Sequence, residues 1–242
     1  NNWTLANGTL TKTEDCPSNV FATLNEISKP SSATLSFGNN YAQTSGSSRD
    51  TLFSTIGVSS GKYYAEFKLV AGESGSVRMD FGINGDPAEI VRSVVPIGNG
   101  ATGYSFDTES AVKVTNGSSA GSFGSTFSIG DIGMLAVDFD NLKIYFGKNG
   151  TWFNSGDPTS GSTGTGSAFN ITAPSSTPSG FYHFGVSDHS TGYNQTFASN
   201  FGNGYFGTTA VSSAGTNASG IGIFEYDVPT GYTALSTKGL NE

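Results

Sequence analysis

Paired carboxylates are the first feature of this 242-residue sequence that could do chemistry, because hydrolysis of a glycosidic bond uses two of them beside the bond. Asp138 and Asp140 are two residues apart in a segment with strand-like alternation, so both would project from one face. The Glu-x-Asp-x-Glu run typical of such hydrolases is absent, and Glu225-Tyr226-Asp227 is the nearest partial match. We therefore predict a solvated strand face, a turn-forming Asp140 and no catalytic carboxylates.

The two histidines raise the alternative of a Ser-His-Asp arrangement, since Asp188 directly precedes His189 and His183 is close by. Neighbouring residues of a strand point to opposite faces, however. No Gly-x-Ser-x-Gly elbow, which places a serine on a turn between a strand and a helix, is apparent before them. The sequence thus predicts that the protein is not an enzyme.

Acidic residues are too scattered along the chain to indicate a metal centre, which needs clustered ligands. We predict no metal site and no cofactor. A calcium ion shared between loops is the alternative, and its candidate ligands are Asp80, Asp86, Asp107, Asp131 and Asp157.

Aromatic side chains near predicted turns are candidates for a glycan site, because their rings can stack on sugar faces. These low-specificity candidates are Tyr104, Trp152, Tyr193 and Tyr205. The alternative for each is packing across a sheet edge, which is the commoner role of a large aromatic next to a hairpin turn.

The elements that would position these residues are best defined in residues 130–153. Leu135, Val137 and Phe139 alternate with smaller or polar residues, the period of a strand with one buried face. Asp140-Asn141 predicts a two-residue turn, and Asn149-Gly150 within the sequence Lys-Asn-Gly is the strongest short hairpin signal. These residues predict a β-meander in the core of an antiparallel sheet.

Similar short strands are predicted throughout the chain. They are expected at 20–25, 34–38, 51–56, 61–69, 77–83, 103–107, 111–114, 181–186 and 194–201. In 61–69, Tyr63, Ala65 and Phe67 share one face while Tyr64 and Glu66 share the other, which predicts a sheet with one wet side. Sustained helical periodicity is not apparent, and the low-complexity residues 154–167 predict a mobile loop.

The whole pattern predicts an all-β, two-sheet antiparallel β-sandwich with very little helix. We expect one domain over 1–242, with N-terminal strands and a loop in 1–50. Because residue 1 is Asn, we also expect the chain to be an excerpt of a longer protein.

Composition excludes several classes of function. Gly makes up 34 residues and charged residues only 12%, but the 12% of aromatic residues argues against disorder. A net charge of −8 with only 11 Lys and Arg predicts no binding to nucleic acid. The sequence contains no apolar run of about 18 residues, so we predict no membrane insertion. The single cysteine, Cys16, excludes an internal disulfide.

Three segments in order resemble the SPRY domain family. They are GKYYAEF at 61–67, GDIG at 130–133 continuing through DFD to NG at 149–150, and NFG at 200–202 followed by FEYDVPTGY at 224–232. The last string, which continues as TALST, is similar to the ends of SPRY-type modules in virion proteins of tailed bacteriophages. The resemblance covers about residues 50–240 as a SPRY-like core. The sequence departs from the family in having Tyr63 at a usual Trp and an insertion at 203–222.

The resemblance implies a concanavalin A-like jelly roll whose loops bind a protein or glycan partner without catalysis. It further implies a tailed-phage virion surface protein: a tail fibre, a capsid decoration or a receptor-binding module for host attachment. Expected partners are other virion proteins, a host cell-surface glycan or protein, and further copies of the chain. The insertion is expected to alter the sandwich edge or to form a contact loop.

Two other hypotheses remain open at this point. The first is a secreted, lectin-like carbohydrate-binding or glycoside-active β-sandwich, which would need an acid pair facing a groove to be active. The second is an intracellular protein-interaction SPRY module, which the composition and the phage-like terminal string disfavour.

Overall fold

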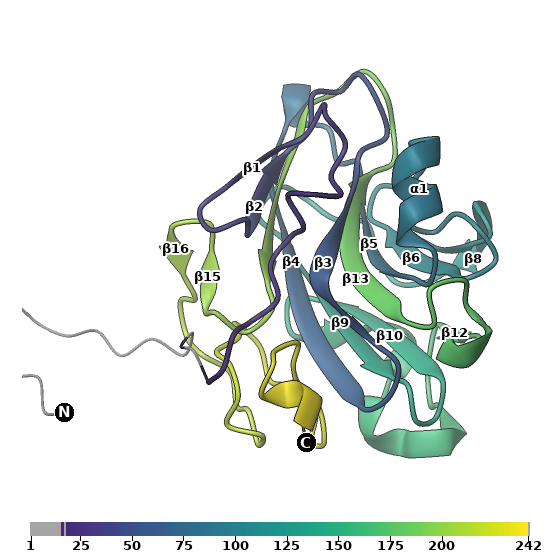
Figure 1. Ribbon diagram of the computed structural model, residues 1–242, viewed down its shortest axis with the longest axis vertical. Helices are drawn as coiled ribbons and strands as arrows, with labels where there is room; N and C mark the ends of the chain where they lie inside the picture. The colour runs from purple at the N-terminus through teal and green to yellow at the C-terminus, as the bar shows by residue number, and fades with distance from the viewer. Residues whose placement is uncertain (1–15, 17, 242) are drawn as a thin grey trace, which may run out of the picture.

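A computed structural model describes residue 16 and residues 18–241 of the protein (Figure 1). Two large sheets pack face to face as a β-sandwich, which confirms the predicted fold class. The predicted features of residues 1–15 lie outside the described residues. No helix in the described part of the chain combines the length and the apolar character needed to cross a membrane.

The first sheet has six strands in the order β3-β13-β5-β6-β7-β8, all antiparallel. Its strands are β3 (Thr51–Val58), β13 (Tyr182–Asp188), β5 (Met79–Asn84), β6 (Gly103–Asp107), β7 (Val112–Thr115) and β8 (Ser118–Ser122).

The second sheet has nine strands, seven of them in the order β1-β2-β14-β4-β9-β10-β11. They are β1 (Thr34–Ser36), β2 (Tyr41–Gln43), β14 (Gln195–Asn200), β4 (Lys62–Gly72), β9 (Ile132–Asp138), β10 (Lys143–Lys148) and β11 (Thr151–Trp152). β12 (Phe169–Asn170) pairs with β10, and β17 (Thr233–Ala234) pairs with β4 in parallel. A separate hairpin joins β15 (Tyr205–Phe206) to β16 (Thr209–Ala210).

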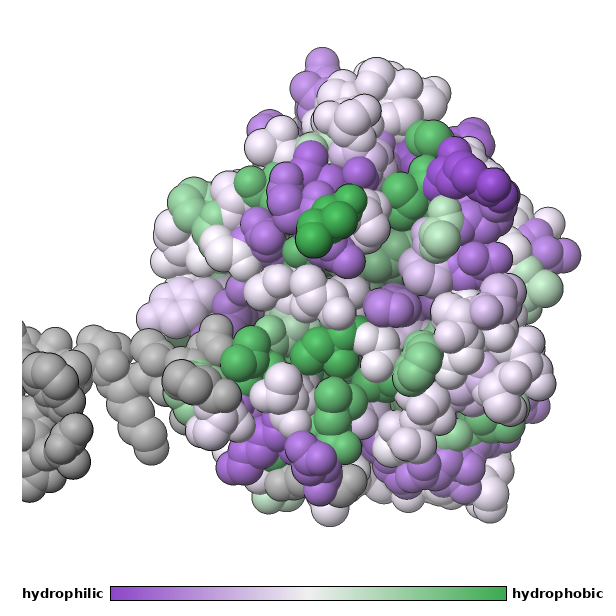
Figure 2. All heavy atoms as spheres, in the orientation of Figure 1, coloured by the Kyte–Doolittle hydropathy of each residue, from purple (hydrophilic) through white to green (hydrophobic). Residues whose placement is uncertain are grey.

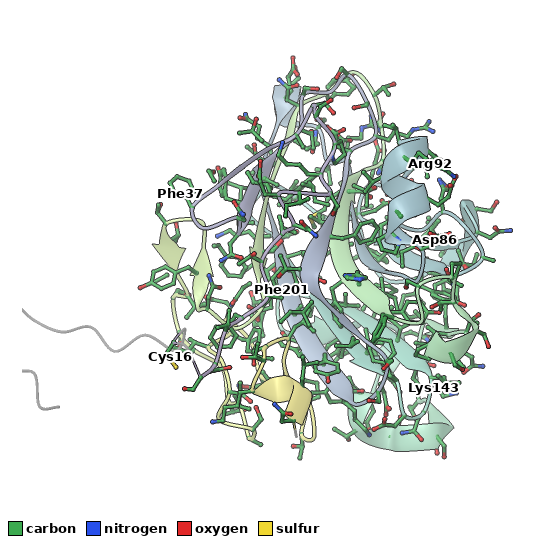
Figure 3. All side chains as sticks on the ribbon, viewed as in Figure 1. Cys16, Phe37, Asp86, Arg92, Lys143 and Phe201 are labelled. Carbon is green, nitrogen blue, oxygen red and sulfur yellow. The ribbon has the colours of Figure 1, made fainter. Side chains whose placement is uncertain are left out.

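The main core lies between the two sheets and is rich in phenylalanine. Phe81 of the first sheet is fully buried, and its ring centroid lies 5.7 Å from that of Phe67 and 5.5 Å from that of Phe146, both in the second sheet. Phe201 stacks edge-on to Phe67 at 5.8 Å and lies in the middle of the molecule (Figure 3). The alternating apolar residues of the sequence therefore do form the buried faces of the strands.

A second apolar core covers the outer face of the nine-stranded sheet, so the predicted wet side is wrong. Tyr64 and Glu66 are both fully buried. The ring of Phe224, from the C-terminal part of the chain, lies 4.9 Å from that of Tyr64 in an edge-on arrangement. The buried members of this core are Phe21, Tyr64, Met134, Ala136, Tyr145, Ile221, Phe224, Val228, Tyr232 and Ala234.

The central meander forms as predicted except at its first turn. β9 pairs with β10 from Asp138 opposite Lys143, which leaves a four-residue turn in place of the predicted two residues. Leu142, at a φ of 57°, supplies the left-handed position there. At the second turn, Lys148 pairs with Thr151 around Asn149-Gly150, both with positive φ, as predicted.

Three other segments differ from the sequence-based prediction. Residues 20–25 form only isolated bridges, from Phe21 to Ser236 and from Leu24 to Ser54. The strand predicted at 77–83 is followed by a short helix that the sequence analysis did not predict, α1 (Pro87–Ser93), whose N-cap is Asp86. Residues 154–167 contain two 3₁₀ helices, η2 (Phe153–Ser155) and η3 (Pro158–Thr163). η3 is bonded to the C-terminal segment just before β17, because the Tyr232 hydroxyl donates to the Pro158 carbonyl at 3.0 Å.

Candidate functional site

The four predicted aromatic candidates lie in four different surroundings. Tyr104 is only 6% exposed, and its ring packs 5.4 Å from that of Phe169. Its hydroxyl is hydrogen-bonded to Thr172. Tyr104 belongs to the core, so its prediction as a ligand-stacking residue is wrong.

The other three candidates reach the surface. Tyr193 is exposed and lies under the guanidinium of Arg78, 5.4 Å from its carbon to the ring centroid. Tyr205 is exposed on the β15–β16 hairpin, within the insertion at 203–222. Trp152 is half-buried, with its ring 6.2 Å from that of Tyr64.

Two exposed aromatic residues, Phe37 and Phe181, were not among the sequence-based candidates. Phe37, in the turn between β1 and β2, is 54% exposed and has a φ of 52°, an outlier for a bulky residue. Its ring contacts Tyr41 edge-on at 5.3 Å, and it lies at the margin of the molecule beside the β15–β16 hairpin (Figure 3). Figure 2 shows that apolar side chains on the viewed face form small groups between polar ones.

Trp152 lines an open pocket of about 310 Å³ together with two carboxylates. Three chain segments meet there: the hairpin that ends at Trp152, the insertion at Gly215, and the terminal string at 225–227. The lining residues are Met134, Gly150, Trp152, Gly215, Glu225, Tyr226 and Asp227. The structure thus brings a predicted aromatic, the predicted insertion and the partial Glu-x-Asp match into one site, which we call the Trp152 pocket.

Close backbone contacts hold the three segments together. A Cβ on Gly150 would lie 3.1 Å from the Tyr226 ring, and one on Gly215 would lie 2.2 Å from the Tyr226 carbonyl carbon. The Gly215 N–H also donates to the Phe224 carbonyl at 2.9 Å. Glycine is therefore required at 215 by close approach, since any side chain there would push the insertion away.

A buried carboxylate under the pocket positions its C-terminal wall. Glu66 accepts hydrogen bonds from the backbone N–H of Glu225 at 3.0 Å and of Tyr226 at 2.9 Å. It also accepts from the Tyr64 hydroxyl and from the Asn200 amide. Burial raises the pKa of Glu66 to about 7, although the four donors act in the opposite direction.

Asn200 completes this support. Its amide donates to the Ile223 carbonyl at 3.0 Å, and its side-chain oxygen accepts from the N–H groups of Gly202 and Gly204 at 2.9 and 3.1 Å. The glutamate of the GKYYAEF string and the asparagine of NFG are thus hydrogen-bonded to each other and to the segments on either side of the insertion.

The two carboxylates of the pocket are already engaged by the insertion. Glu225 accepts from the Ser212 N–H at 2.7 Å, and Asp227 accepts from the Thr216 N–H at 2.6 Å. The backbone and hydroxyl of Thr216 lower the pKa of Asp227, which keeps it ionised and unsuited to protonating a leaving group.

Asp138 and Asp140 do not share a solvated face, so that prediction is wrong. Asp138 is buried, pairs with the Lys62 ammonium at 2.9 Å and accepts two hydrogen bonds from Asn141. Asp140 is exposed in the turn, as predicted for that residue, and accepts from the Gly61 N–H at 2.9 Å. Both carboxylates fix backbone turns.

The histidines are not part of a nucleophilic triad in the described structure. Burial lowers the pKa of His183, whose Nδ1 lies 2.9 Å from the Ser54 carbonyl oxygen. Asp188 accepts from Thr44 and Ser190, not from its neighbour His189. The letters Gly-x-Ser-x-Gly do occur at 117–121, but this segment contains most of strand β8 and is not an elbow before a helix.

The comparisons with known proteins bear on the fold. No protein-family model and no curated protein matches the sequence. Among solved structures, the chain is similar to the SPRY domain of human HERC1, with 19% sequence identity and a TM-score of 0.50 over 70% of this chain and 94% of that one. The chain has a SPRY-like fold. The resemblance inferred from three sequence motifs is confirmed at the level of this SPRY-like sandwich.

Proposed function

We propose that this chain is a non-catalytic binding module that holds a glycan in the Trp152 pocket and is displayed on the surface of a tailed-phage particle. The observation that carries the binding proposal is the meeting of Trp152, Tyr226 and two carboxylates around one open pocket. The residues come from segments far apart in sequence, and a buried hydrogen-bond network holds one wall in place.

The chemistry of the pocket suits a sugar. An aromatic ring offers an apolar face for the C–H side of a pyranose, and Trp152 is half-buried with part of its surface exposed. Ionised carboxylates only accept hydrogen bonds, so Glu225 and Asp227 would pair with sugar hydroxyls. A volume of about 310 Å³ falls at the lower end of the range of ~300–1,000 Å³ for small-ligand pockets.

The same contacts favour binding over hydrolysis. A glycosidase needs one carboxyl group that carries a proton at working pH and a second that is ionised. The pKa of Asp227 is lowered, and the Asp138–Asp140 pair is divided between a buried ion pair and an exposed turn. These features support a module that retains its ligand unchanged.

The location on a virion rests on the sequence. The terminal string FEYDVPTGYTALST resembles that of phage SPRY-type modules, and it also supplies Glu225 and Asp227 to the pocket. An acidic exterior with few lysines would limit non-specific adhesion to anionic cell surfaces. A secreted lectin-like protein is the second candidate, since it would use the same pocket.

Binding of purified residues 1–242 to glycan arrays and to candidate host bacteria tests the proposal. We expect saturable binding that one sugar competes away and that Trp152→Ala or Asp227→Asn weakens at least ~10-fold. Phe181→Ala, which removes a 48% exposed ring outside the pocket, is the matched control. Absence of binding to every glycan and cell, or an equal loss of binding in the control, would overturn the binding proposal. Detection of the chain in phage particles by immunogold labelling tests the virion location.

A further inference from the structure

A second cluster of chemistry-bearing residues lies at one end of the six-stranded sheet. Asp80 of β5 and Asp107 of β6 are direct cross-strand partners. His189 directly follows β13, the neighbour of β5 on its other side, and its N–H donates to the Arg78 carbonyl at 3.1 Å. The sheet thus brings together three residues that are scattered in the sequence.

These side chains converge without satisfying one another. The Asp80 carboxylate oxygen Oδ1 lies 3.2 Å from His189 Nδ1, and an Asp107 oxygen lies 3.8 Å from the same nitrogen. Asp80 is only 3% exposed, yet its Oδ1 accepts no hydrogen bond, and His189 Nδ1 makes none either within the described residues. Like charges directly opposite each other on paired strands are destabilising, and a protonated His189 ring is the positive group that faces both carboxylates when no metal ion is bound.

The other nitrogen of His189 is held by a second carboxylate. Nε2 lies 3.1 Å from Glu109, which is also paired with the Arg78 guanidinium. A metal ion would displace the proton from Nδ1, and with Nε2 donating to Glu109 the Nδ1 lone pair would then face Asp80 and Asp107. A carboxylate on the far nitrogen is the arrangement that orients a metal-binding histidine and raises its basicity.

The cluster is accessible from solvent. Asp80, Asp107 and His189 line one pocket of about 380 Å³, which also includes the exposed Arg49 and the side of β7 at Val112 and Val114. One ligand atom from each of the three residues lies within 4.8 Å of the others. A small cation could therefore enter and contact all three without a rearrangement of the strands.

We propose that Asp80, Asp107 and His189 form a binding site for a divalent first-row cation, with Zn²⁺ as the best match. Tetrahedral ligands about 2.0–2.1 Å from zinc are separated from each other by about 3.3 Å, close to the separations of His189 Nδ1 from the two carboxylates. Imidazole combined with carboxylates suits zinc better than calcium, which takes six to eight oxygen ligands. Three protein ligands leave a position open toward the pocket for water or a ligand atom.

Titration of metal-free residues 1–242 with ZnCl₂ by isothermal calorimetry tests this site, with CaCl₂ and MgCl₂ as the comparison. One equivalent of Zn²⁺ should bind, and Asp80→Asn or His189→Gln should weaken that binding at least ~100-fold. Glu109→Gln, which leaves the three ligands in place, should weaken it ~10-fold through the orientation of the ring. Glu89→Gln on α1 is the control carboxylate and should leave binding unchanged.

Nuclear magnetic resonance provides a readout that needs no variant to fold. The chain has two histidines, so the ring signals of His189 should shift on addition of Zn²⁺ while those of His183 stay in place. If no binding is detected at 1 mM Zn²⁺, the dissociation constant is weaker than millimolar and the proposal is overturned. Binding that survives both Asp80→Asn and His189→Gln, or a shift of His183 alone, would overturn it equally.

Discussion

The carboxylate of Glu66 accepts a hydrogen bond of 2.9 Å from the backbone N–H of Tyr226, a residue 160 positions later in the chain. Glu66 itself is fully buried on the outer face of the nine-stranded sheet. It fixes the terminal string against β4 and thereby sets one wall of the Trp152 pocket. A residue that looks like an exposed strand glutamate in the sequence is the support of the candidate site.

Glu66 should make stability depend on pH. Its pKa is about 7 in the folded protein against an ordinary 4.5, so the folded state binds more protons than the unfolded state between these values. Stability contributed by this group is present below about pH 4.5 and decreases by about 3 kcal/mol as the pH rises through 7. Chemical denaturation of Glu66→Gln at pH 5 and pH 8 should show a smaller fall than the parent protein.

Glu26→Gln is the control for this measurement, because Glu26 is exposed and makes only a 3.6 Å ion pair with Lys29. It should retain the pH dependence of the parent protein. An equal slope in Glu66→Gln and the parent would show that Glu66 does not titrate in this range.

Gly215 should be intolerant of any side chain. A Cβ at this position would lie 2.2 Å from the Tyr226 carbonyl carbon and 2.5 Å from the Asp227 nitrogen, both backbone atoms that cannot rotate away. Gly215→Ala should lower the melting temperature and weaken binding in the Trp152 pocket at least ~10-fold. Ser213→Ala, an exposed position in the same insertion, should change neither quantity; unaltered binding by Gly215→Ala would separate the insertion from the pocket.

Local patterns in the sequence were sufficient to predict the strands, but not to predict which distant segments pack against them. The alternation in 61–69 correctly predicts β4, and Asn149-Gly150 correctly predicts a hairpin, because both signals depend on adjacent residues. The burial of Glu66 depends on a segment that begins more than 150 residues later, and that segment has no strand-like alternation. The pairing of Asp80 with Asp107 likewise requires the register of two strands separated by α1.

Phe81 should be the most sensitive position of the main core. Its ring is fully buried and lies within 6.0 Å of four other phenylalanine rings, by centroid distance. Phe81→Ala should cost about 3–5 kcal/mol of unfolding free energy, and Phe81→Leu about 1 kcal/mol, because the smaller deletion leaves a smaller cavity. Phe181→Ala, at an exposed ring, should lie within about 0.5 kcal/mol of the parent in the same denaturation experiment.

Asp138 should stabilise the folded protein at pH values above the pKa of its carboxyl group. Burial raises the pKa of this carboxyl, but the hydrogen bonds from Lys62 and Asn141 outweigh burial and place the pKa below 3.8. The stability it contributes is therefore present above about pH 4 and is lost as the pH falls through the folded pKa.

Asp138→Asn should lower the unfolding free energy at pH 7 by about 1–3 kcal/mol, because one hydrogen-bond acceptor is lost at a buried site beside the Lys62 ammonium. Asp140→Asn, whose side chain still accepts from Gly61 in an exposed turn, should change it by less than about 0.5 kcal/mol. Equal effects of the two substitutions in urea denaturation would mean that the Lys62–Asp138 pair contributes no more than a surface contact.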